Sequence, residues 1–246
     1  MSTHSRNRVY HYARTLQAWL LPYTCILCRK EAETGIDLCQ ACLNSLPWLD
    51  ACCFRCALPL PPGAAGKNLC GACLNRPPAF YRAVSAFHYA DPVAGLVTAF
   101  KYRQKLLYGE VLAALLLRRL EFCYRDSPCP DLLVPVPLHP RRLRQRGFNQ
   151  ALELARPIAT RLGIPLHHSC CRRLRQTPPQ LGLSAPQRRR NLRNAFALQA
   201  GSMQDVGRVA LIDDVMTTGS TLQELSRLLI SHGVREVHVW SVARTI

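Results

Sequence analysis

The sequence contains no hydrophobic run long enough to cross a membrane as a helix. Its longest apolar stretch, VLAALLLRRL at residues 111–120, is broken by Arg118 and Arg119, whereas a bilayer requires about 20 consecutive apolar residues. The first 22 residues carry arginines and apolar residues at helical spacing, but the apolar stretch that follows the arginines is short, contains Pro22 and lacks a small-residue cleavage site. We therefore expect a short amphipathic N-terminal helix, no membrane span and a cytoplasmic location.

Acidic side chains are scarce. The chain has 15 Asp and Glu against 32 Lys and Arg, which gives a formal net charge of +17. The imbalance is greatest between residues 139 and 193, where 13 arginines stand against one acid, Glu153. Such a segment favours a polyanionic partner or a phosphate-rich ligand, although a solvated basic face has the same composition.

Two widespread phosphate-binding motifs are missing. The chain has no G-x-x-x-x-G-K-[ST], and its C-terminal part has no G-x-G-x-x-G. Instead, the apolar run at 209–212 leads into Asp213 and Asp214, which are followed by the turn VMTTGST at 215–221. In parallel sheets, ligands bind beyond the carboxyl ends of the strands, where such a turn leads into the next helix.

The residue types of this stretch suit a sugar phosphate. Successive backbone N–H groups, a glycine and short hydroxyls at a helix N-terminus bind a phosphate dianion. Carboxylates would repel that phosphate, so we expect Asp213 and Asp214 to accept hydrogen bonds from ribose hydroxyls, with Mg²⁺ bridging the rest of the ligand. The sequence thus predicts a ribose 5-phosphate that carries more phosphate; the alternative is an ordinary helix capped by Thr218 or Ser220.

Hydrophobic periodicity divides much of the chain into alternating strands and helices. Strands are predicted at 83–89, 131–137, 208–213 and 236–243, and helices at 92–104, 106–122, 147–163 and 220–233. This alternation predicts an α/β fold with a parallel sheet flanked by helices. The segment from Cys171 to about Asn194 has weak periodicity and is interpreted as a long surface loop, of the kind that often covers a site.

The N-terminal third is rich in cysteine. Nine of the 13 cysteines lie between Cys25 and Cys73, mostly in C-x-x-C pairs. This spacing is typical of structural Zn²⁺ sites, whose thiolates replace the core that a small module cannot build. We expect two Cys₄ sites, with either consecutive or interleaved pairing, formed by Cys25, Cys28, Cys39, Cys42, Cys53, Cys56, Cys70 and Cys73.

The other cysteines and the linker complete the domain division. Cys52, Cys123, Cys129, Cys170 and Cys171 are expected to be buried or free thiols. The two prolines at 77–78 suit an interdomain link. We therefore predict a helix and zinc-ribbon module at 1–78 and a sheet domain at 79–246, and we expect removal of the metal to unfold 25–73 while leaving the sheet domain mostly intact.

Several motifs resemble a known family. VALIDDVMTTGSTL at 209–222 is similar to the motif that binds phosphoribosyl pyrophosphate (PRPP) in type I phosphoribosyltransferases. Together with the cysteine pairs, the stretches FKYRQ, VPVPLHPRRLRQRGFNQA, RRRNLRNAF and VWSVARTI resemble the ComF and GntX proteins over nearly the whole chain; ACCFRC departs from the family by adding Cys52 beside an expected pair. The resemblance implies a zinc ribbon before a type I phosphoribosyltransferase-like domain, PRPP binding with Mg²⁺, and a link to natural competence and the use of external DNA.

The resemblance also implies roles for individual residues. Asp213 and Asp214 would hold the ribose hydroxyls, and the 5-phosphate would lie against Thr217, Thr218, Gly219, Ser220 and Thr221. Candidates for pyrophosphate binding are Arg146, Gly147, Phe148, Asn149, Gln150 and, more weakly, Lys101 and Arg103. A lid at 176–196 would add Gln180, Arg188, Arg189 and Asn191. The structural alternatives are a helix start with surface arginines at 146–150 and a solvated helix end at 101–103.

Two kinds of function remain open on the sequence alone. An active enzyme would displace pyrophosphate from the anomeric carbon through an oxocarbenium-like state, but no residue stands out as a general base and the acceptor is not assigned. The alternative is a non-catalytic protein that senses PRPP or handles single-stranded DNA as a zinc-ribbon adaptor. The expected partners are PRPP, single-stranded DNA or nucleotides, and DNA-uptake or helicase proteins.

Overall fold

The computed structural model describes residues 23–32, 35–61, 68–102, 106–175 and 195–246. The chain divides into two compact units, Met1–Leu46 and Pro47–Ile246. In the described residues, no helix combines the length and the apolar character that a bilayer crossing requires.

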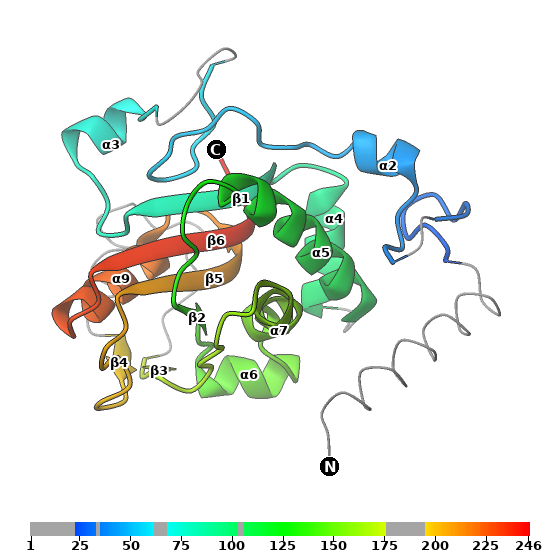
Figure 1. The fold of residues 1–246 in the computed structure, drawn as a ribbon. Helices are drawn as coiled ribbons and strands as arrows, with labels where there is room; N and C mark the ends of the chain where they lie inside the picture. The colour runs from blue at the N-terminus through cyan, green and yellow to red at the C-terminus, as the bar shows by residue number, and fades with distance from the viewer. Residues whose placement is uncertain (1–22, 33–34, 62–67, 103–105, 176–194) are drawn as a thin grey trace. The chain divides into compact units, whose positions relative to one another are not determined.

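Four parallel strands form the central sheet of the larger unit (Figure 1). Their order across the sheet is β1 (Arg82–His88), β6 (Glu236–Arg244), β5 (Arg208–Met216) and β2 (Leu132–Pro135). Nearly every residue of these strands is buried or half-buried. Such continuous burial is expected when helices cover both faces of a parallel sheet.

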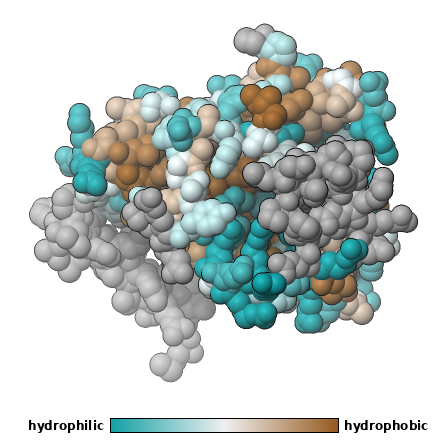
Figure 2. Space-filling view, turned by 180° about the vertical axis from the view of Figure 1, so that it is seen from behind, coloured by the Kyte–Doolittle hydropathy of each residue, from teal (hydrophilic) through white to brown (hydrophobic). Residues whose placement is uncertain are grey.

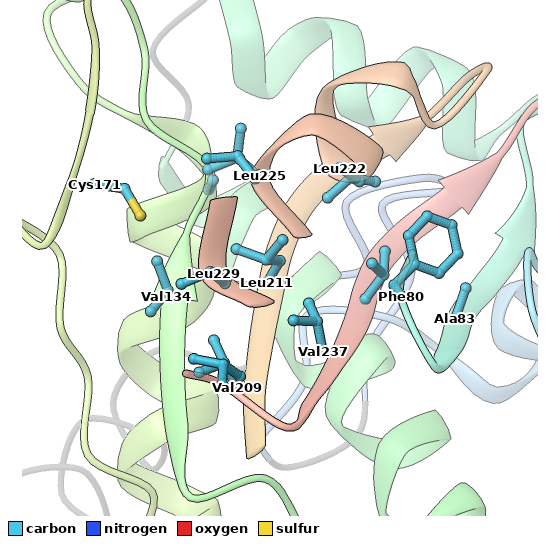
Figure 3. Packing of buried hydrophobic residues seen from close by; sticks show 14 of the residues in the cluster. Phe80, Ala83, Val134, Cys171, Val209, Leu211, Leu222, Leu225, Leu229 and Val237 are labelled. Carbon is cyan, nitrogen blue, oxygen red and sulfur yellow. The ribbon is translucent and has the colours of Figure 1, made fainter. Parts of the chain in front are cut away.

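One face of the sheet is covered by α9 (Ser220–Ser231). The apolar residues of this helix recur every three or four positions, so Leu222, Leu225 and Leu229 lie on one side of it. They share a buried cluster with Val209 and Leu211 of β5, which project to that face at the two-residue spacing of a strand (Figure 3).

Three other helices, apart from α9, contact the sheet or one another. They are α4 (Val93–Tyr102), α5 (Leu106–Cys123) and α7 (Gln150–Leu162). α5 contacts β1 and β6, α7 contacts β5 and β2, and α4 packs on α5. The predicted α/β fold, a parallel sheet flanked by helices, is therefore confirmed, and the predicted strands and helices of the sheet domain match the observed ones to within a few residues. The predicted N-terminal helix lies outside the described residues.

Two short elements differ from the sequence-based interpretation. Residues 140–146 form α6 (Pro140–Arg146), which begins at a proline and ends at Gly147 in the left-handed region with φ of 83°. The segment expected to be a loop from Cys171 onward starts with β3 (Cys171–Arg173), which pairs in antiparallel fashion with β4 (Phe196–Leu198). Three-residue strands that pair across a long connection leave little periodic signal in the sequence.

Two cysteine modules, one at residues 25–44 and the other at residues 47–75, have similar local structures. Each contains a five-residue helix that starts directly after a cysteine: α2 (Gln40–Asn44) follows Cys39 and α3 (Gly71–Asn75) follows Cys70. The corresponding sequences, CQACLN and CGACLN, differ at a single position. The sequence-based reading missed this internal repeat, although the letters alone reveal it.

The repeat extends to the first cysteine pair of each module. The residue after that pair has positive φ in both, 63° at Arg29 and 53° at Ala57. Its N–H group donates to the carbonyl of the pair's first cysteine over 2.8 Å in each case. This tight turn brings the two thiols of each C-x-x-C pair close together.

The second module packs into the core of the sheet domain. The N–H group of Leu49 donates to the carbonyl of Ala86 in β1 (2.9 Å), and the N–H group of Ala83 donates to the carbonyl of Phe54 (3.1 Å). Leu49 and Ala57 are fully buried in the same cluster that holds the α9 leucines. The compact units separate between residues 46 and 47, and a domain boundary near residue 78 stays a prediction from the two prolines.

Large apolar side chains that reach solvent come from separate elements. Examples are Leu74, Phe122, Leu174 and Ile230, all at least 42% exposed. The coloured part of the face seen in Figure 2 shows separate small hydrophobic areas among hydrophilic ones. Scattered exposed apolar residues are normal for a globular protein and do not mark a site.

Candidate functional site

The two adjacent aspartates lie near the carboxyl end of β5, in the middle of the sheet. Asp213 Oδ1 accepts a hydrogen bond from the N–H group of Asp214 (2.9 Å), and Asp214 Oδ1 accepts one from the N–H group of Val215 (2.8 Å). Neighbouring residues of a strand project to opposite faces. At this edge of the sheet, the two carboxylates therefore project to opposite faces.

Asp214 is buried and paired with a lysine. Only 4% of the residue is exposed, and its Oδ2 lies 2.7 Å from Nζ of Lys101, which is in the last turn of α4. No donor among the described residues has hydrogen-bonding geometry toward this Oδ2, so its contact with Lys101 is one of charge. The oxygen retains capacity to accept a hydrogen bond from a ligand hydroxyl.

Asp213 is half-buried, and its proton is held unusually tightly. Burial raises the pKa of Asp213 to about 8, and the neighbouring charge of Asp214 acts in the same direction, while Lys101 opposes both. Two carboxyl groups so close together in a partly desolvated place resist joint ionisation. A partner that needs both carboxylates must therefore displace a proton at neutral pH.

The turn after the aspartates carries the geometry of an anion cradle. Gly219 adopts the left-handed conformation (φ 71°) directly before α9, and as the N-cap residue it has no side chain with which to cap the helix. The Thr218 and Ser220 hydroxyls instead contact each other, with 2.8 Å between Oγ1 and Oγ. The N-cap position is therefore held by Gly219, and not by Thr218 or Ser220, at a helix N-terminus of the kind that suits an anion.

The segment expected to bind pyrophosphate lies beside the end of α4. The rings of Phe148 and Phe100 are 5.4 Å apart, and the guanidinium of Arg146 lies 5.3 Å from the centre of the exposed Tyr102 ring. These contacts place residues 146–148 near Lys101 and thus on the side of the sheet edge that Asp214 faces. Gly147 has positive φ and is exposed to solvent.

Asn149 and Gln150 have structural contacts in this state. The Asn149 carboxamide accepts a hydrogen bond from the N–H group of Ala151 and donates one to the carbonyl of Val136, each over 3.1 Å. It thereby caps α7 and fastens the helix to the residue after β2. Gln150 is buried, and its Oε1 has no hydrogen-bond partner among the described residues. A role for either residue in pyrophosphate binding stays a prediction.

Four predicted lid residues, Gln180, Arg188, Arg189 and Asn191, and Arg103 lie outside the described residues. The β3–β4 pair supplies an arginine that the sequence did not single out. Burial and the charge of Arg142 in α6 lower the pKa of Arg173, whereas Asp213 raises it. Arg142, Arg173 and Asp213 are therefore within electrostatic reach of one another. Only the pairing of β3 with β4 reveals this, because Arg173 is 40 residues from Asp213 in the sequence.

The eight predicted metal ligands form two separate sets. The four sulfur atoms of Cys25, Cys28, Cys39 and Cys42 lie within 4.8 Å of one another, and the same holds for Cys53, Cys56, Cys70 and Cys73. The pairing is thus consecutive and not interleaved. The Sγ–Sγ distances of 3.6 Å between Cys28 and Cys39 and 3.7 Å between Cys56 and Cys70 match the edge of a tetrahedron around Zn²⁺, about 3.8 Å for Zn–S bonds of about 2.3 Å.

The backbone around each first cysteine favours a thiolate. Burial opposes the charge, but hydrogen bonds from the N–H groups of Cys28 and Cys39 help to lower the pKa of Cys25 to about 6. In the second set, N–H groups of Cys70 and Cys56 likewise help to lower the pKa of Cys53 to about 7 despite burial. Since the thiolate is the metal ligand, both sets suit structural zinc.

A buried arginine connects the second cysteine set to the turn after the aspartates. Arg244, the last residue of β6, is 8% exposed. Its Nη1 donates to the carbonyls of Met216 (3.2 Å), Thr217 and Thr245, and its Nε donates to the carbonyl of Cys56 (3.1 Å). An arginine that ends the otherwise apolar stretch VHVWSVAR is the signal that the sequence offered for it.

These features define a class of protein. The chain matches the family models of a double zinc ribbon domain at residues 16–74 and a phosphoribosyl transferase domain at residues 149–245. It is 38% identical over 231 residues to the DNA utilization protein YhgH of Salmonella typhi, covering 92% of this chain and 99% of that protein. It is also 37% identical over 229 residues to competence protein F of Haemophilus influenzae, covering 90% and 97%.

The protein therefore belongs to the ComF/YhgH family of zinc-ribbon proteins with a phosphoribosyltransferase-like domain. Among solved structures, it is similar to orotate phosphoribosyltransferase from Aeropyrum pernix, with 19% identity and a TM-score of 0.35 over 58% of this chain and 74% of that one. Adenine phosphoribosyltransferase from Saccharomyces cerevisiae gives 16% identity and a TM-score of 0.34 over 58% and 71%.

Proposed function

We propose that this protein binds PRPP at the carboxyl end of β5 and uses that binding in the utilisation of external DNA. One observation carries the proposal: Asp213 and Asp214 directly precede a turn in which left-handed Gly219 opens α9 without a side-chain cap. A ribose needs hydrogen-bond acceptors for its hydroxyls, and its 5-phosphate needs N–H donors a few ångströms away. This stretch supplies both in that order.

Each part of the ligand has a candidate partner in the chain. The carboxylates of Asp213 and Asp214 would accept hydrogen bonds from the two ribose hydroxyls, and the residues Thr217–Thr221 would surround the 5-phosphate. Lys101 and Arg146 would face the pyrophosphate, because cationic groups stabilise its charge. The Asp214 carboxylate, whose Oδ2 contacts Lys101 here, is also a ligand type that suits Mg²⁺, which would offset the charge of the pyrophosphate when bound.

Chemical turnover would need little beyond this arrangement. When pyrophosphate leaves the anomeric carbon, positive charge develops on the ribose ring. Asp213 and Asp214 would stabilise that charge, while Lys101 and Arg146 would stabilise the leaving pyrophosphate. The nucleophile is the unassigned part of the reaction, and Arg173 near Asp213 marks the side from which an anionic acceptor would be received.

A second function, the handling of single-stranded DNA without catalysis, is favoured by α6. Arg141, Arg142 and Arg144 of this short helix are all exposed, and the relatives are named for competence and DNA utilisation. Phosphate contacts made by such arginines would weaken steeply as salt is raised. The same basic surface would then guide DNA past the sugar-phosphate site.

The test is calorimetric titration of the purified protein with PRPP and Mg²⁺, followed by detection of released pyrophosphate with candidate acceptors. We expect saturable binding that an Asp213→Asn, Asp214→Asn double variant loses. An Asp131→Asn variant, altered at the opposite end of the sheet, is the matched control. Binding that is equally strong in the double variant would refute the assigned site, and binding without pyrophosphate release would favour the non-catalytic function.

A further inference from the structure

One buried side chain touches both the proposed phosphate turn and the second cysteine set. Arg244 donates from Nη1 to the carbonyls of Met216 and Thr217, the residues that lead from β5 into the turn, and from Nε to the carbonyl of Cys56. Cys56 is one of the four cysteines of the second set, which could hold a metal ion. A single planar guanidinium thus contacts both the second cysteine set and the turn that is proposed to bind phosphate.

The charge of Arg244 has no carboxylate beside it. Among the described residues, no Asp or Glu lies within ion-pair distance of its guanidinium, in contrast to Arg208 and Arg119. The favourable charges around it are those of the thiols of Cys56, Cys70 and Cys73. Four thiolates around one Zn²⁺ carry net negative charge, so the filled cysteine site supplies the countercharge that a buried guanidinium requires.

The hydrogen bonds to Met216 and Thr217 have a direct consequence for the turn. A carbonyl that is held in one direction fixes its peptide plane, and the N–H group of the following residue then points the other way. Arg244 therefore orients the peptides of Thr217 and Thr218, which carry the first donors of the cradle. Residues that hold functional groups in position in this way are often as important as the groups themselves.

We propose that Arg244 is a positioning residue for the phosphate-binding turn and that it makes ligand binding there depend on metal occupancy of the Cys53–Cys56–Cys70–Cys73 site. The identity of the ligand rests on the proposed function; the mechanical link does not. Loss of the metal would release the Cys56 carbonyl and leave the guanidinium buried without a countercharge. Arg244 and the turn would then shift together.

The link can be tested first without any ligand, by hydrogen exchange at residues 216–221. Arg244→Gln, which keeps a donor but removes the charge and the fork, should speed exchange there by about tenfold or more, equivalent to about 1.4 kcal/mol. Arg208→Gln, at the opposite end of the neighbouring strand β5, is the matched control and should leave the turn unchanged. Unchanged exchange in Arg244→Gln would overturn the proposal whatever the protein binds.

The metal dependence needs a second pair of variants. Cys70→Ser, Cys73→Ser empties the second set and should speed exchange at 216–221, whereas Cys25→Ser, Cys28→Ser empties the first set and should not. In an Arg244→Gln background, emptying the second set should add little, because the link is already cut. If emptying the second set speeds exchange at 216–221 equally in the presence and absence of Arg244, the metal acts only through general stability.

A kinetic measurement keeps the proposal testable if those cysteine variants fail to fold. In the wild-type protein, release of the two zinc ions to a coloured chelator should show two phases, and ribose 5-phosphate should slow only one of them, because coupling between two sites is reciprocal. That slowing should vanish in Arg244→Gln. If the wild-type protein binds PRPP but ribose 5-phosphate slows neither phase of zinc release, the link is wrong and the proposed function stands. If hydrogen exchange at 216–221 changes in Arg244→Gln but no sugar phosphate binds to the wild type, the link stands and the proposed function is wrong.

Discussion

At the scale of single residues, the site depends on charged side chains that are far apart in the sequence but close together in the structure. Asp213 and Asp214 were predicted as ligands because a turn rich in hydroxyls follows them. Their partner Lys101 was only a weak candidate, since it is more than a hundred residues away and a lysine near a helix end is usually solvated. The 2.7 Å contact between Lys101 and Asp214 exists because parallel pairing brings the end of β5 close to α4.

The proton on Asp213 gives a prediction in pH. With its pKa at about 8, Asp213 is largely protonated at pH 7, and a ribose hydroxyl needs the carboxylate as acceptor. Affinity for PRPP should therefore rise as pH increases from 6.5 to 8.5, by up to about tenfold per pH unit below the pKa. Titration calorimetry in buffers of different ionisation enthalpy should also show proton release. An affinity that does not change over this range would contradict the assignment.

The same residue should limit stability. The folded protein holds this proton more tightly than the unfolded chain, whose aspartates titrate near pH ~4, so the associated stability is complete below that pH and is lost as pH rises to about 8. Asp213→Asn should therefore raise the free energy of unfolding at pH 8.5, by at least about 1 kcal/mol. Urea unfolding at pH 5 and pH 8.5 measures this, and Asp131→Asn should show no such gain.

At the scale of elements, long periodic segments could be predicted and short non-local ones could not. The strands at 208–216 and 236–244 and the helix at 220–231 carry their period in their own residues. The β3–β4 pair joins three-residue strands that come together only when the sheet domain has formed. Its arginine, Arg173, therefore escaped a reading of the sequence even though it lies near the aspartates.

The turn that opens α9 allows a test with an internal control. A Cβ atom at Gly219 would lie 2.8 Å from Met216 Cε, whereas one at Gly163, which has nearly the same φ (67° against 71°), would meet nothing within 4 Å. Both alanine variants should lose about 1–2 kcal/mol of stability from the left-handed backbone. Only Gly219→Ala should also weaken PRPP binding, by about tenfold or more. Equal affinities of the two variants would exclude a role for the turn in binding.

At the scale of the whole molecule, the two cysteine modules belong to different compact units. The spacing of the cysteines predicted both metal sets, because ligands within a module are close in sequence. It could not predict that the second module joins the core of the sheet domain, since that depends on the packing of Leu49, Ala57 and Phe80 between residues far apart. From this packing we expect, in contrast to the prediction from sequence, that the stability of the sheet domain depends on the metal.

Removal of zinc should destabilise the sheet domain as well as the cysteine modules. We expect a chelator to lower the melting temperature of the sheet, followed by far-ultraviolet circular dichroism, by several degrees or more, because a kilocalorie of stability corresponds to roughly 2–4 °C in a domain of this size. A variant that lacks only the first set, Cys25→Ser, Cys28→Ser, should melt like the wild type. A sheet that melts at the same temperature with and without chelator would show that the second set stabilises only its own loops.

The placement of Leu49 and Ala57 beside Phe80 also decides where this protein can be cut. A fragment that begins at Ala79 would retain all four strands and the entire aspartate turn, and by sequence it would look like a complete catalytic half. It would nevertheless leave Phe80 and the outer edge of β1 bare to solvent and remove the backbone partners of Ala83 and Ala86. The smallest stretch expected to remain soluble when expressed alone starts instead at Pro47, so the second cysteine set would have to be kept together with the proposed sugar-phosphate site as part of its scaffold.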